Sequence, residues 1–237
     1  MKTAVVTGAS RGIGRSIAVA LSQKGYFVCV NYLRDRPGAG ETLREILEAG
    51  GNGMTFRADV RNPHEIGEMF EAACANGVLS VLVNNAGVSH MGLLQSMSDR
   101  EIKSVIDTDL LGTLFCSREA VPRLLQSHNG SIVNIASVWG VCGASCETVY
   151  SAAKAGVTGF TKALAKELGP SGINVNCVSP GVIDTEMNSG LDLDSLAEQT
   201  LAGRIGRPEE IARAVVFLTE NSYITGQNII VDGGFIS

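Results

Sequence analysis

Strand-like and helix-like stretches alternate along this chain, and the alternation restricts its fold more than any other feature. Apolar, β-branched runs typical of strands fall near residues 2–7, 26–31, 53–58, 79–83, 130–136, 173–178 and 227–231. Amphipathic segments of helical length separate them, near residues 12–24, 38–49, 63–76, 99–126, 148–168 and 208–219. Because strands joined through helices pair in parallel, the sequence predicts an α/β fold, a doubly wound parallel sheet of about seven strands with helices on both faces.

Local signals support several helix starts and indicate the number of domains. Ser98-Asp-Arg-Glu101 has the pattern of a capping box, and Pro63 and Pro208 stand at first helical positions. No Pro/Gly/Ser linker, internal repeat or low-complexity tract divides the chain. Since 237 residues fit around one core, we expect a single domain over residues 1–237.

Composition and charge exclude several classes of protein. The formal net charge is −5 and no basic cluster occurs, so nucleic acid is not an expected partner. The N-terminus lacks a signal-peptide pattern, and no apolar run reaches the roughly 18 residues that a membrane span needs. We therefore expect a soluble, cytoplasmic protein that does not contact a membrane.

The cysteines and histidines do not form a pattern that would bind a metal. None of the six cysteines forms a C-x-x-C pair, and several lie within apolar runs. Cys142 and Cys146 are the only close pair, and His64, His90 and His128 are scattered. We expect reduced, buried thiols and no metal site.

A glycine-rich turn, Thr7-Gly-Ala-Ser-Arg-Gly-Ile-Gly14, follows the first predicted strand and opens the first long predicted helix. Gly8 permits the tight turn, Gly12 lets the backbone approach a pyrophosphate, and Gly14 allows the helix to pack closely on the strand. The free N–H groups at the start of the helix then face the phosphates. This arrangement predicts a Rossmann-like dinucleotide site in preference to a purely structural turn.

The residues after the second predicted strand indicate which dinucleotide binds. NAD-binding proteins carry an acidic residue there for the ribose 2′-OH, whereas this chain has Asn31. Arg11 in the glycine turn and Arg34 provide two guanidinium groups that suit a 2′-phosphate. Asp35 opposes this interpretation because it would partly neutralise Arg34, and either arginine could be plain solvated surface. On balance we expect NADP(H).

The candidate catalytic groups are Tyr150 and Lys154, four residues apart, and Ser137, thirteen residues before the tyrosine. On a helix, Tyr150 and Lys154 share one face. An ammonium beside a phenol lowers the phenol pKa from about 10 toward the range where it exchanges protons near neutrality. Ser137 ends a predicted strand, at the sheet edge where a hydroxyl would bind a substrate carbonyl oxygen. By itself the tyrosine–lysine spacing more often marks only a helix face.

Five motifs follow one another along the chain: Thr7–Gly14, Asn84-Asn-Ala-Gly87, Ser137, Tyr150-x-x-x-Lys154 and Val231-Asp-Gly-Gly234. In this order they resemble the short-chain dehydrogenase/reductase family over essentially all 237 residues. The resemblance implies that hydride passes between the nicotinamide and a carbonyl carbon. Ser137 would hold the carbonyl oxygen, Tyr150 would give it a proton, and Lys154 would lower the Tyr150 pKa and bind the nicotinamide ribose.

The same resemblance implies further cofactor contacts. Asp59-Val60 looks like the adenine contact, and Ser179-Pro-Gly181 with Thr185 looks like the loop on the nicotinamide side. The complete predicted cofactor set is Gly8, Ser10, Arg11, Gly12, Ile13, Gly14, Asn31, Arg34, Asp59, Val60, Asn85, Ala86, Gly87, Tyr150, Lys154, Pro180, Gly181, Ile183 and Thr185.

Asp109 departs from the family pattern, and we include it in the predicted catalytic set for that reason. Relatives usually carry asparagine here, where it helps to hold a water that links the lysine to solvent. If the main-chain carbonyl holds that water, Asp109 is harmless. If its carboxylate reaches Lys154, it would offset part of the charge that acts on Tyr150.

Two substrate classes fit the resemblance. Thr7–Gly14, Asn84–Gly87 and Ser179–Met187 look most like 3-oxoacyl-[acyl-carrier-protein] reductases, usually homotetramers, which serve fatty acid biosynthesis. The loop before Tyr150 lacks their common Gly-Gln-x-Asn-Tyr ending. Together with Ser89-His90, it instead resembles reductases of a 5-aminopentanone group on elongation factor P.

Glu147 gives the second substrate class a physical motive. Its carboxylate would pair with a substrate amine, although a glutamate near a helix start often only caps or decorates it. We place the thioester slightly ahead because that group of enzymes is more abundant. A third hypothesis, a dinucleotide-binding scaffold or sensor without turnover, is opposed by the intact Ser137, Tyr150 and Lys154.

Two further expectations concern assembly and movement. The helices near 99–126 and 148–168 would pair across a two-fold axis in a homodimer or homotetramer, which rests mainly on the family resemblance. Residues 182–204 are the least patterned stretch, and we expect them to form a lid that orders when cofactor and substrate bind.

Overall fold

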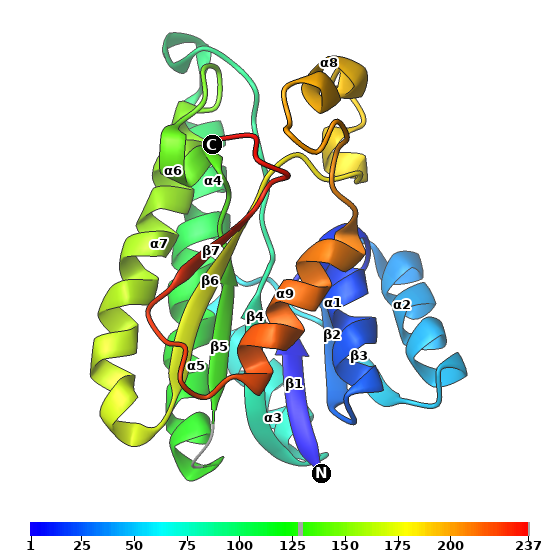
Figure 1. Cartoon of the computed structure of the whole chain (residues 1–237). Helices are drawn as coiled ribbons and strands as arrows, with labels where there is room; N and C mark the ends of the chain where they lie inside the picture. Colours follow the sequence, from blue (N-terminus) through cyan, green and yellow to red (C-terminus); the bar gives the residue numbers. More distant parts are fainter. Residues whose placement is uncertain (128–129, 237) are drawn as a thin grey trace.

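The computed structural model describes residues 1–127 and 130–236. In this part of the chain seven parallel strands form one sheet in the order β3-β2-β1-β4-β5-β6-β7 (Figure 1). The order reverses between β1 and β4, and open α/β sheets bind ligands at the carboxyl ends of the strands beside such a point. The predicted α/β class and doubly wound parallel sheet are confirmed. The strands are β1 (Lys2–Val6), β2 (Phe27–Tyr32), β3 (Asn52–Arg57), β4 (Val78–Asn84), β5 (Ser131–Ile135), β6 (Asn174–Pro180) and β7 (Asn228–Val231).

The helices begin where local chemistry predicted them. Ser98 and Glu101 form a reciprocal capping box, in which each side chain accepts a hydrogen bond from the other residue's backbone N–H. Pro63 and Pro208 each open a helix at its first position. The α-helices are α1 (Gly12–Gln23), α2 (Arg36–Glu48), α3 (Pro63–Cys74), α4 (Asp99–Val105), α5 (Gly112–Ser127), α6 (Trp139–Cys142), α7 (Thr148–Leu168), α8 (Leu193–Glu198) and α9 (Pro208–Glu220).

Helices cover both faces of the sheet. Helices α1, α2 and α9 pack on one face, and α3, α5 and α7 pack on the other (Figure 1). Successive residues of β1 point alternately to the two layers: Ala4 and Val6 join the core beneath α1 and α9, and Val5 joins the core beneath α3 and α5. Burial on both faces explains the apolar runs of the inner strands such as β1 and β4, whereas the edge strands β3 and β7 are only partly buried.

The segment predicted as one helix over 99–126 differs from that prediction. A π-helix, Ile106–Leu111, separates α4 from α5. A π-bulge inserts an extra residue per turn without breaking an apolar stripe, so the periodicity did not reveal it. The stripe itself packs inside the chain, since Ile102, Val105 and Leu110 contact apolar residues of α7.

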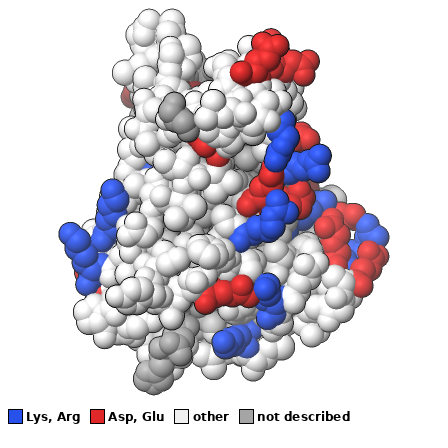
Figure 2. Space-filling view, in the orientation of Figure 1, with Lys and Arg blue, Asp and Glu red and all other residues white. Residues whose placement is uncertain are grey.

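The surface carries charges of both signs. Figure 2 shows basic and acidic side chains interleaved over α9 and α2, without a continuous basic area on that face. Among the described residues, no helix combines the length and apolar character that a bilayer crossing requires. All six cysteines are free thiols, and Cys29, Cys116 and Cys177 are buried as predicted.

Candidate active site

The glycine turn lies between the carboxyl end of β1 and the start of α1, and each predicted glycine role has a structural counterpart. Gly8 has φ +61° and packs against Ala86, so that a side chain at this position would meet the Ala86 backbone at 2.8 Å. Gly12 has φ +53° and faces Thr185. Gly14 is buried against the Gly8 carbonyl and the Asn85 amide, which leaves no room for a side chain.

The N-terminus of α1 is suited to bind an anion. No side chain caps it, and its first turn contains no acidic residue. The N–H groups of Gly12, Ile13 and Gly14 belong to the first turn, where helical hydrogen bonds provide no partner. These donors and the helix dipole provide the cradle that a pyrophosphate needs.

The structure assigns Asn31 a different role from the predicted one. The strand ends at Tyr32, and Asn31 is buried with its side chain turned toward the glycine turn. Its amide oxygen accepts a hydrogen bond from Gly8 N at 3.1 Å, and its Nδ2 donates to the Ala58 carbonyl at 3.1 Å. Asn31 therefore fixes the glycine turn against β3 and has no free group for a ribose phosphate.

Arg11 and Arg34, the two guanidinium groups predicted to bind a 2′-phosphate, are both exposed. Arg34 is exposed, and its charge helps to lower the pKa of Asp59. Among the described residues Asp35 forms no ion pair with Arg34, and its carboxylate caps α2 by accepting from Gly38 N at 2.9 Å. Arg11 is exposed and forms an ion pair with Glu186 at 2.7 Å.

The remaining predicted cofactor contacts gather at the carboxyl edge of the sheet. Asn85 ties the segment after β4 to the glycine turn, because its Nδ2 donates to the Thr7 and Gly8 carbonyls at 2.9 and 3.0 Å. Thr185 reaches back over Gly12. The other residues of this set lie at the carboxyl end of β1, β3, β4 or β6 or in the segment that follows: Ser10, Asp59, Val60, Ala86, Gly87, Pro180, Gly181 and Ile183.

The three predicted catalytic side chains converge at this edge. Ser137 follows β5 and its hydroxyl accepts a hydrogen bond from Trp139 N at 3.1 Å. Tyr150 and Lys154 lie one turn apart on α7, with Lys154 Nζ 5.4 Å from the centre of the tyrosine ring. Lys154 is buried and donates to the Ile135 carbonyl at 3.1 Å, which anchors α7 to the end of β5.

Asp109 reaches this cluster from the π-helix. Its Oδ2 lies 3.1 Å from Lys154 Nζ, and its Oδ1 accepts a hydrogen bond from Val88 N at 2.9 Å. Its main-chain carbonyl accepts from the Thr113 hydroxyl at 2.9 Å. Of the two arrangements considered from the sequence, the structure shows the one in which the carboxylate contacts the lysine.

These charges change the expected acidity of Tyr150. The sequence predicted that Lys154 would lower the Tyr150 pKa. Burial raises that pKa, Lys154 lowers it, and Asp109 raises it again, so the pKa lies above its ordinary value. Burial lowers the Lys154 pKa, but Asp109 and Tyr150 outweigh burial and the net shift is upward. Burial also raises the Asp109 pKa, against the effects of Lys154 and Val88 N.

Glu147 stands at the start of α7 beside the catalytic tyrosine. It occupies the N-cap position, but its side chain makes no capping hydrogen bond. Among the described residues its carboxylate has no ion-pair partner, and burial raises its pKa. The capping interpretation is therefore wrong, and a half-buried carboxylate stands unpaired near the site.

Two glycine contacts with the catalytic residues were missed: Gly140 was not predicted as a site residue, and Gly87 was predicted only as a cofactor contact. A side chain at Gly140 would come within 2.7 Å of the Lys154 backbone, so only glycine lets α6 approach α7 this closely. A side chain at Gly87 would lie 2.8 Å from Asp109 Oδ2 and 3.4 Å from Lys154 Nζ. Their place beside Trp139 and within Asn84–Gly87 was a signal that could have identified them.

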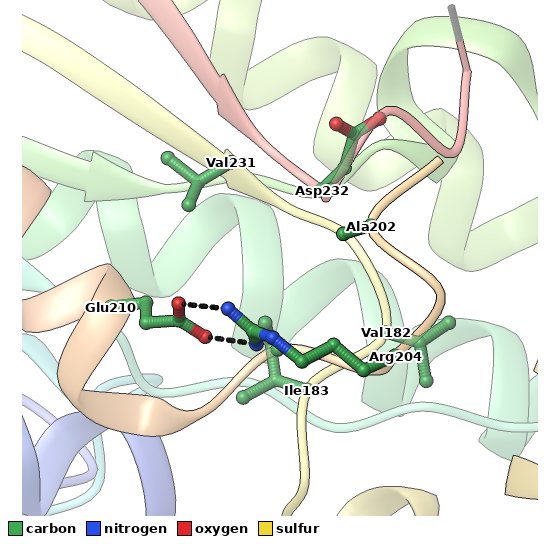
Figure 3. A pocket seen from close by; sticks show the side chains of 9 residues that line it. Val182, Ile183, Ala202, Arg204, Glu210, Val231 and Asp232 are labelled. Carbon is green, nitrogen blue, oxygen red and sulfur yellow. Dashed lines mark hydrogen bonds and ion pairs between the residues drawn. The ribbon is translucent and has the colours of Figure 1, made fainter. Parts of the chain in front are cut away.

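Segment 182–204 contacts the glycine turn, because Thr185 lies against Gly12 and Glu186 pairs with Arg11. It contains α8 and a 3₁₀ turn at Glu186–Asn188, and it is tied to the rest of the chain where Ile183 pairs with Gly206. Figure 3 shows a small pocket at its base, where Arg204 and Glu210 form an ion pair at 2.7 Å. This pocket lies apart from the catalytic side chains, and we assign it a structural role.

Several known proteins are similar to this chain in sequence or in structure. A family model described as enoyl-(acyl carrier protein) reductase matches residues 8–236. A 3-oxoacyl-[acyl-carrier-protein] reductase FabG from Staphylococcus aureus is 43% identical over 240 residues, which cover 98% of this chain and 97% of that protein. The chain belongs to the short-chain dehydrogenase/reductase family.

Other members of the short-chain dehydrogenase/reductase family align just as completely. A 3-oxoacyl-[acyl-carrier-protein] reductase from Synechocystis is 40% identical over 99% of this chain and 97% of its own length. Carbonyl reductase family member 4 from Danio rerio is 42% identical over 98% and 97%. The crystal structure of a putative gluconate dehydrogenase from Agrobacterium tumefaciens superposes with a TM-score of 0.95 at 33% identity, covering 100% of this chain and 96% of that one.

As a short-chain dehydrogenase/reductase, the chain is an oxidoreductase that uses NADP(H) and acts on a carbonyl or hydroxyl group. The free N–H groups of α1 and the exposed Arg11 and Arg34 fit this phosphorylated dinucleotide. Residues 1–127 and 130–236 contain no group of three or more histidine, cysteine or acidic side chains that could hold a metal ion. His128, one of the scattered histidines, lies outside the described residues.

Proposed function

We propose that this enzyme is an NADPH-dependent reductase of 3-oxoacyl thioesters carried on acyl carrier protein. The convergence of Ser137, Tyr150 and Lys154 beside the glycine turn carries the proposal. The full-length similarity to 3-oxoacyl-[acyl-carrier-protein] reductases supports the substrate class.

Two hydroxyl groups and one ammonium of this chain take part in the proposed reaction. The bound cofactor supplies a hydride to the carbonyl carbon. The Ser137 hydroxyl holds the carbonyl oxygen, and the Tyr150 hydroxyl donates the proton that this oxygen needs as its charge develops. An ammonium has three N–H donors; Lys154 donates one to the Ile135 carbonyl, and a second lies on the side of Asp109 Oδ2, 3.1 Å from Nζ. The third is free for a ribose hydroxyl.

The same two hydroxyls favour a ketone over a carbon–carbon double bond. The matching family model is described by an enoyl reductase activity, whereas the aligned relatives are named for reduction of a 3-oxo group. A carbonyl oxygen accepts two hydrogen bonds and then a proton, which is what Ser137 and Tyr150 offer. In an enoyl thioester the acceptor is the thioester carbonyl oxygen, which stands two carbons away from the carbon that receives the hydride, whereas in a ketone these hydroxyls hold the oxygen on that carbon itself.

The test follows NADPH oxidation at about 340 nm with acetoacetyl thioester as substrate, because the cofactor carries the redox change. Wild type is compared with Tyr150→Phe, which keeps the ring and removes the acidic hydroxyl. We expect turnover in wild type and a loss of at least about a hundredfold in the variant. A chain that binds NADPH but turns over no ketone would instead support the scaffold hypothesis.

Glu147 favours a second candidate, the reduction of a ketone that carries an amine. Its carboxylate is half-buried and has no partner among the described residues. Because an ion pair in a partly desolvated site contributes more than one in water, a substrate ammonium would occupy this position favourably. The 5-aminopentanone group on elongation factor P is the substrate of this kind that the loop resemblance indicates.

Glu147→Gln separates the two candidates. For a ketone with a primary amine, the loss of a charged hydrogen bond of about 1.5–3 kcal/mol should lower kcat/KM at least about tenfold. The same ketone with an acetylated amine, and acetoacetyl thioester, serve as controls that should be unaffected. Equal kcat/KM values for the amine and its acetylated form in wild type would exclude the second candidate.

We also propose that the enzyme works as a homodimer or homotetramer. Helices α4, α5 and α7 would form the two-fold contact, as the family resemblance implies. Much of the apolar stripe on α4 packs within the chain. An interface between two copies of the chain would therefore have to use the face of this helix that remains exposed. Light scattering during size-exclusion chromatography gives the molar mass, and a monomer at working concentration would contradict this proposal.

A further inference from the structure

A buried carboxylate and a buried ammonium meet at the centre of the site. The Asp109 and Lys154 side chains are 0% and 5% exposed, and Oδ2 and Nζ are 3.1 Å apart. Removing two charges from water is costly, and a buried pair is retained where its charges have a use. Lys154 already has a second fixed acceptor in the Ile135 carbonyl, so anchoring the lysine does not by itself require a carboxylate.

The local backbone holds Asp109 in place independently of the ion pair. Val88 N donates to Oδ1 at 2.9 Å and fixes the carboxylate directly, whereas the Thr113 hydroxyl only donates back to the main-chain carbonyl one turn earlier. The π-helix turns this residue inward, and Gly87 leaves the space that the carboxylate and the ammonium occupy. The aspartate is thus preorganised on rigid elements, as a group that tunes chemistry must be.

We propose that Asp109 is a positioning residue that offsets the charge of Lys154 and thereby keeps the Tyr150 hydroxyl protonated, so that the site is set to donate a proton. This inference rests on the proposed reductase function, in which Tyr150 is the acid. It deepens that function by predicting that proton donation continues in mildly alkaline solution.

The charged and titratable groups that face Tyr150 agree with this role. Lys154, on the same helix, lowers the Tyr150 pKa; Asp109, from the π-helix, and Glu147, from the start of α7, both raise it. The Ser137 side chain, beyond β5, lowers it by hydrogen bonding. Asp109 is the acidic group that also contacts the lysine directly.

Asp109→Asn removes the charge and keeps a side-chain oxygen for Val88 N, and Thr113→Val is the matched control. The control removes a hydrogen bond to the Asp109 main chain within the same buried region and leaves every charge in place. Relatives usually carry asparagine at position 109, so the variant is expected to fold; near-UV circular dichroism checks this.

The first readout needs no activity. Tyrosinate absorbance of the protein without cofactor is titrated with pH, and the signal of Tyr150→Phe is subtracted to isolate Tyr150. We expect Tyr150 to titrate above about 10 in wild type and in Thr113→Val, and about one pH unit or more lower in Asp109→Asn. A Tyr150 titration below about 10 in wild type, or the same titration in wild type and Asp109→Asn, would overturn the proposal.

The second readout is the pH profile of thioester reduction. The falling alkaline limb of kcat/KM should move down by the same amount in Asp109→Asn and stay in place in Thr113→Val. Failure of the proposed function is distinguishable from failure of this inference. If the thioester is not reduced but Tyr150 titrates as expected, the proposed substrate is wrong. If the thioester is reduced but the Tyr150 titration is the same in wild type and Asp109→Asn, the proposed role of Asp109 is wrong.

Discussion

Arg11 of the glycine turn and Glu186 of segment 182–204 form an ion pair, with Arg11 Nη1 2.7 Å from Glu186 Oε2. The pair joins the glycine turn to this segment. Since Arg11 is also a candidate ligand for the 2′-phosphate, we expect the phosphate and Glu186 to compete for one guanidinium.

Glu186→Gln should therefore strengthen NADPH binding. Both partners are more than half exposed, and exposed pairs contribute only about 0.2–1 kcal/mol, so the Kd should fall by no more than about fivefold. Fluorescence titration with NADPH gives the value. Glu220→Gln breaks a similarly exposed pair with Lys24 and should leave the Kd unchanged. An equal gain for NADH, which lacks the 2′-phosphate, would contradict the competition.

Gly87→Ala should disrupt the catalytic cluster. The added methyl group would lie 2.8 Å from Asp109 Oδ2 and 3.4 Å from Lys154 Nζ, so the ion pair must shift. Displacing catalytic groups by about 1 Å costs up to about a hundredfold in rate, and overpacking costs about 1–3 kcal/mol in stability. Steady-state NADPH oxidation and urea unfolding measure both effects.

The control for this change is Gly67→Ala in α3, where the added methyl group meets nothing within 4 Å. An alanine in an exposed helix interior stabilises by about 1 kcal/mol relative to glycine, and the reduction rate should not change. A Gly87→Ala enzyme as active as wild type would mean that the Asp109–Lys154 geometry is unimportant for turnover.

Acid should weaken the ion pair between Arg204 and Glu210, which lies where segment 182–204 joins the rest of the chain. Hydrogen bonds from Arg204 and from Arg207 N lower the Glu210 pKa from 4.5 to about 2. A carboxylate with a lowered pKa in the folded state stabilises the fold above its ordinary pKa, and this contribution disappears as pH falls from about 4.5 toward 2. The Tm advantage of wild type over Glu210→Gln should accordingly be full near neutrality and shrink through this range. A difference independent of pH would contradict the assignment.

Much of the fold could be predicted because the pattern and the structure depend on the same physics. Buried parallel strands must be apolar on both faces, so β1 to β7 stand within about two residues of their predicted ranges. Helix starts with a capping box or a proline were predicted correctly because those signals are local. Helices α6 and α8 were missed because four and six residues are too few to show a helical period.

Contacts between distant residues account for the other errors. Asn31 stands where the family places a ribose ligand, but its side chain turned out to brace Gly8 and Ala58. The opposing effects on the Tyr150 pKa depend on burial and on a π-helix that brings Asp109 to Lys154. No periodicity or spacing encodes either arrangement, since both arise from packing between separate elements.

The most direct test of the central claim follows the hydride itself. The enzyme is given 3-oxoacyl-[acyl-carrier-protein] and NADPH that carries two deuterium atoms at nicotinamide C4, in normal water, and the product is analysed by mass spectrometry. We predict a 3-hydroxyacyl product with a single deuterium at C3, formed by wild type and at least about a hundredfold more slowly by Tyr150→Phe. A product without deuterium, or equal product from both enzymes, would contradict hydride transfer assisted by Tyr150.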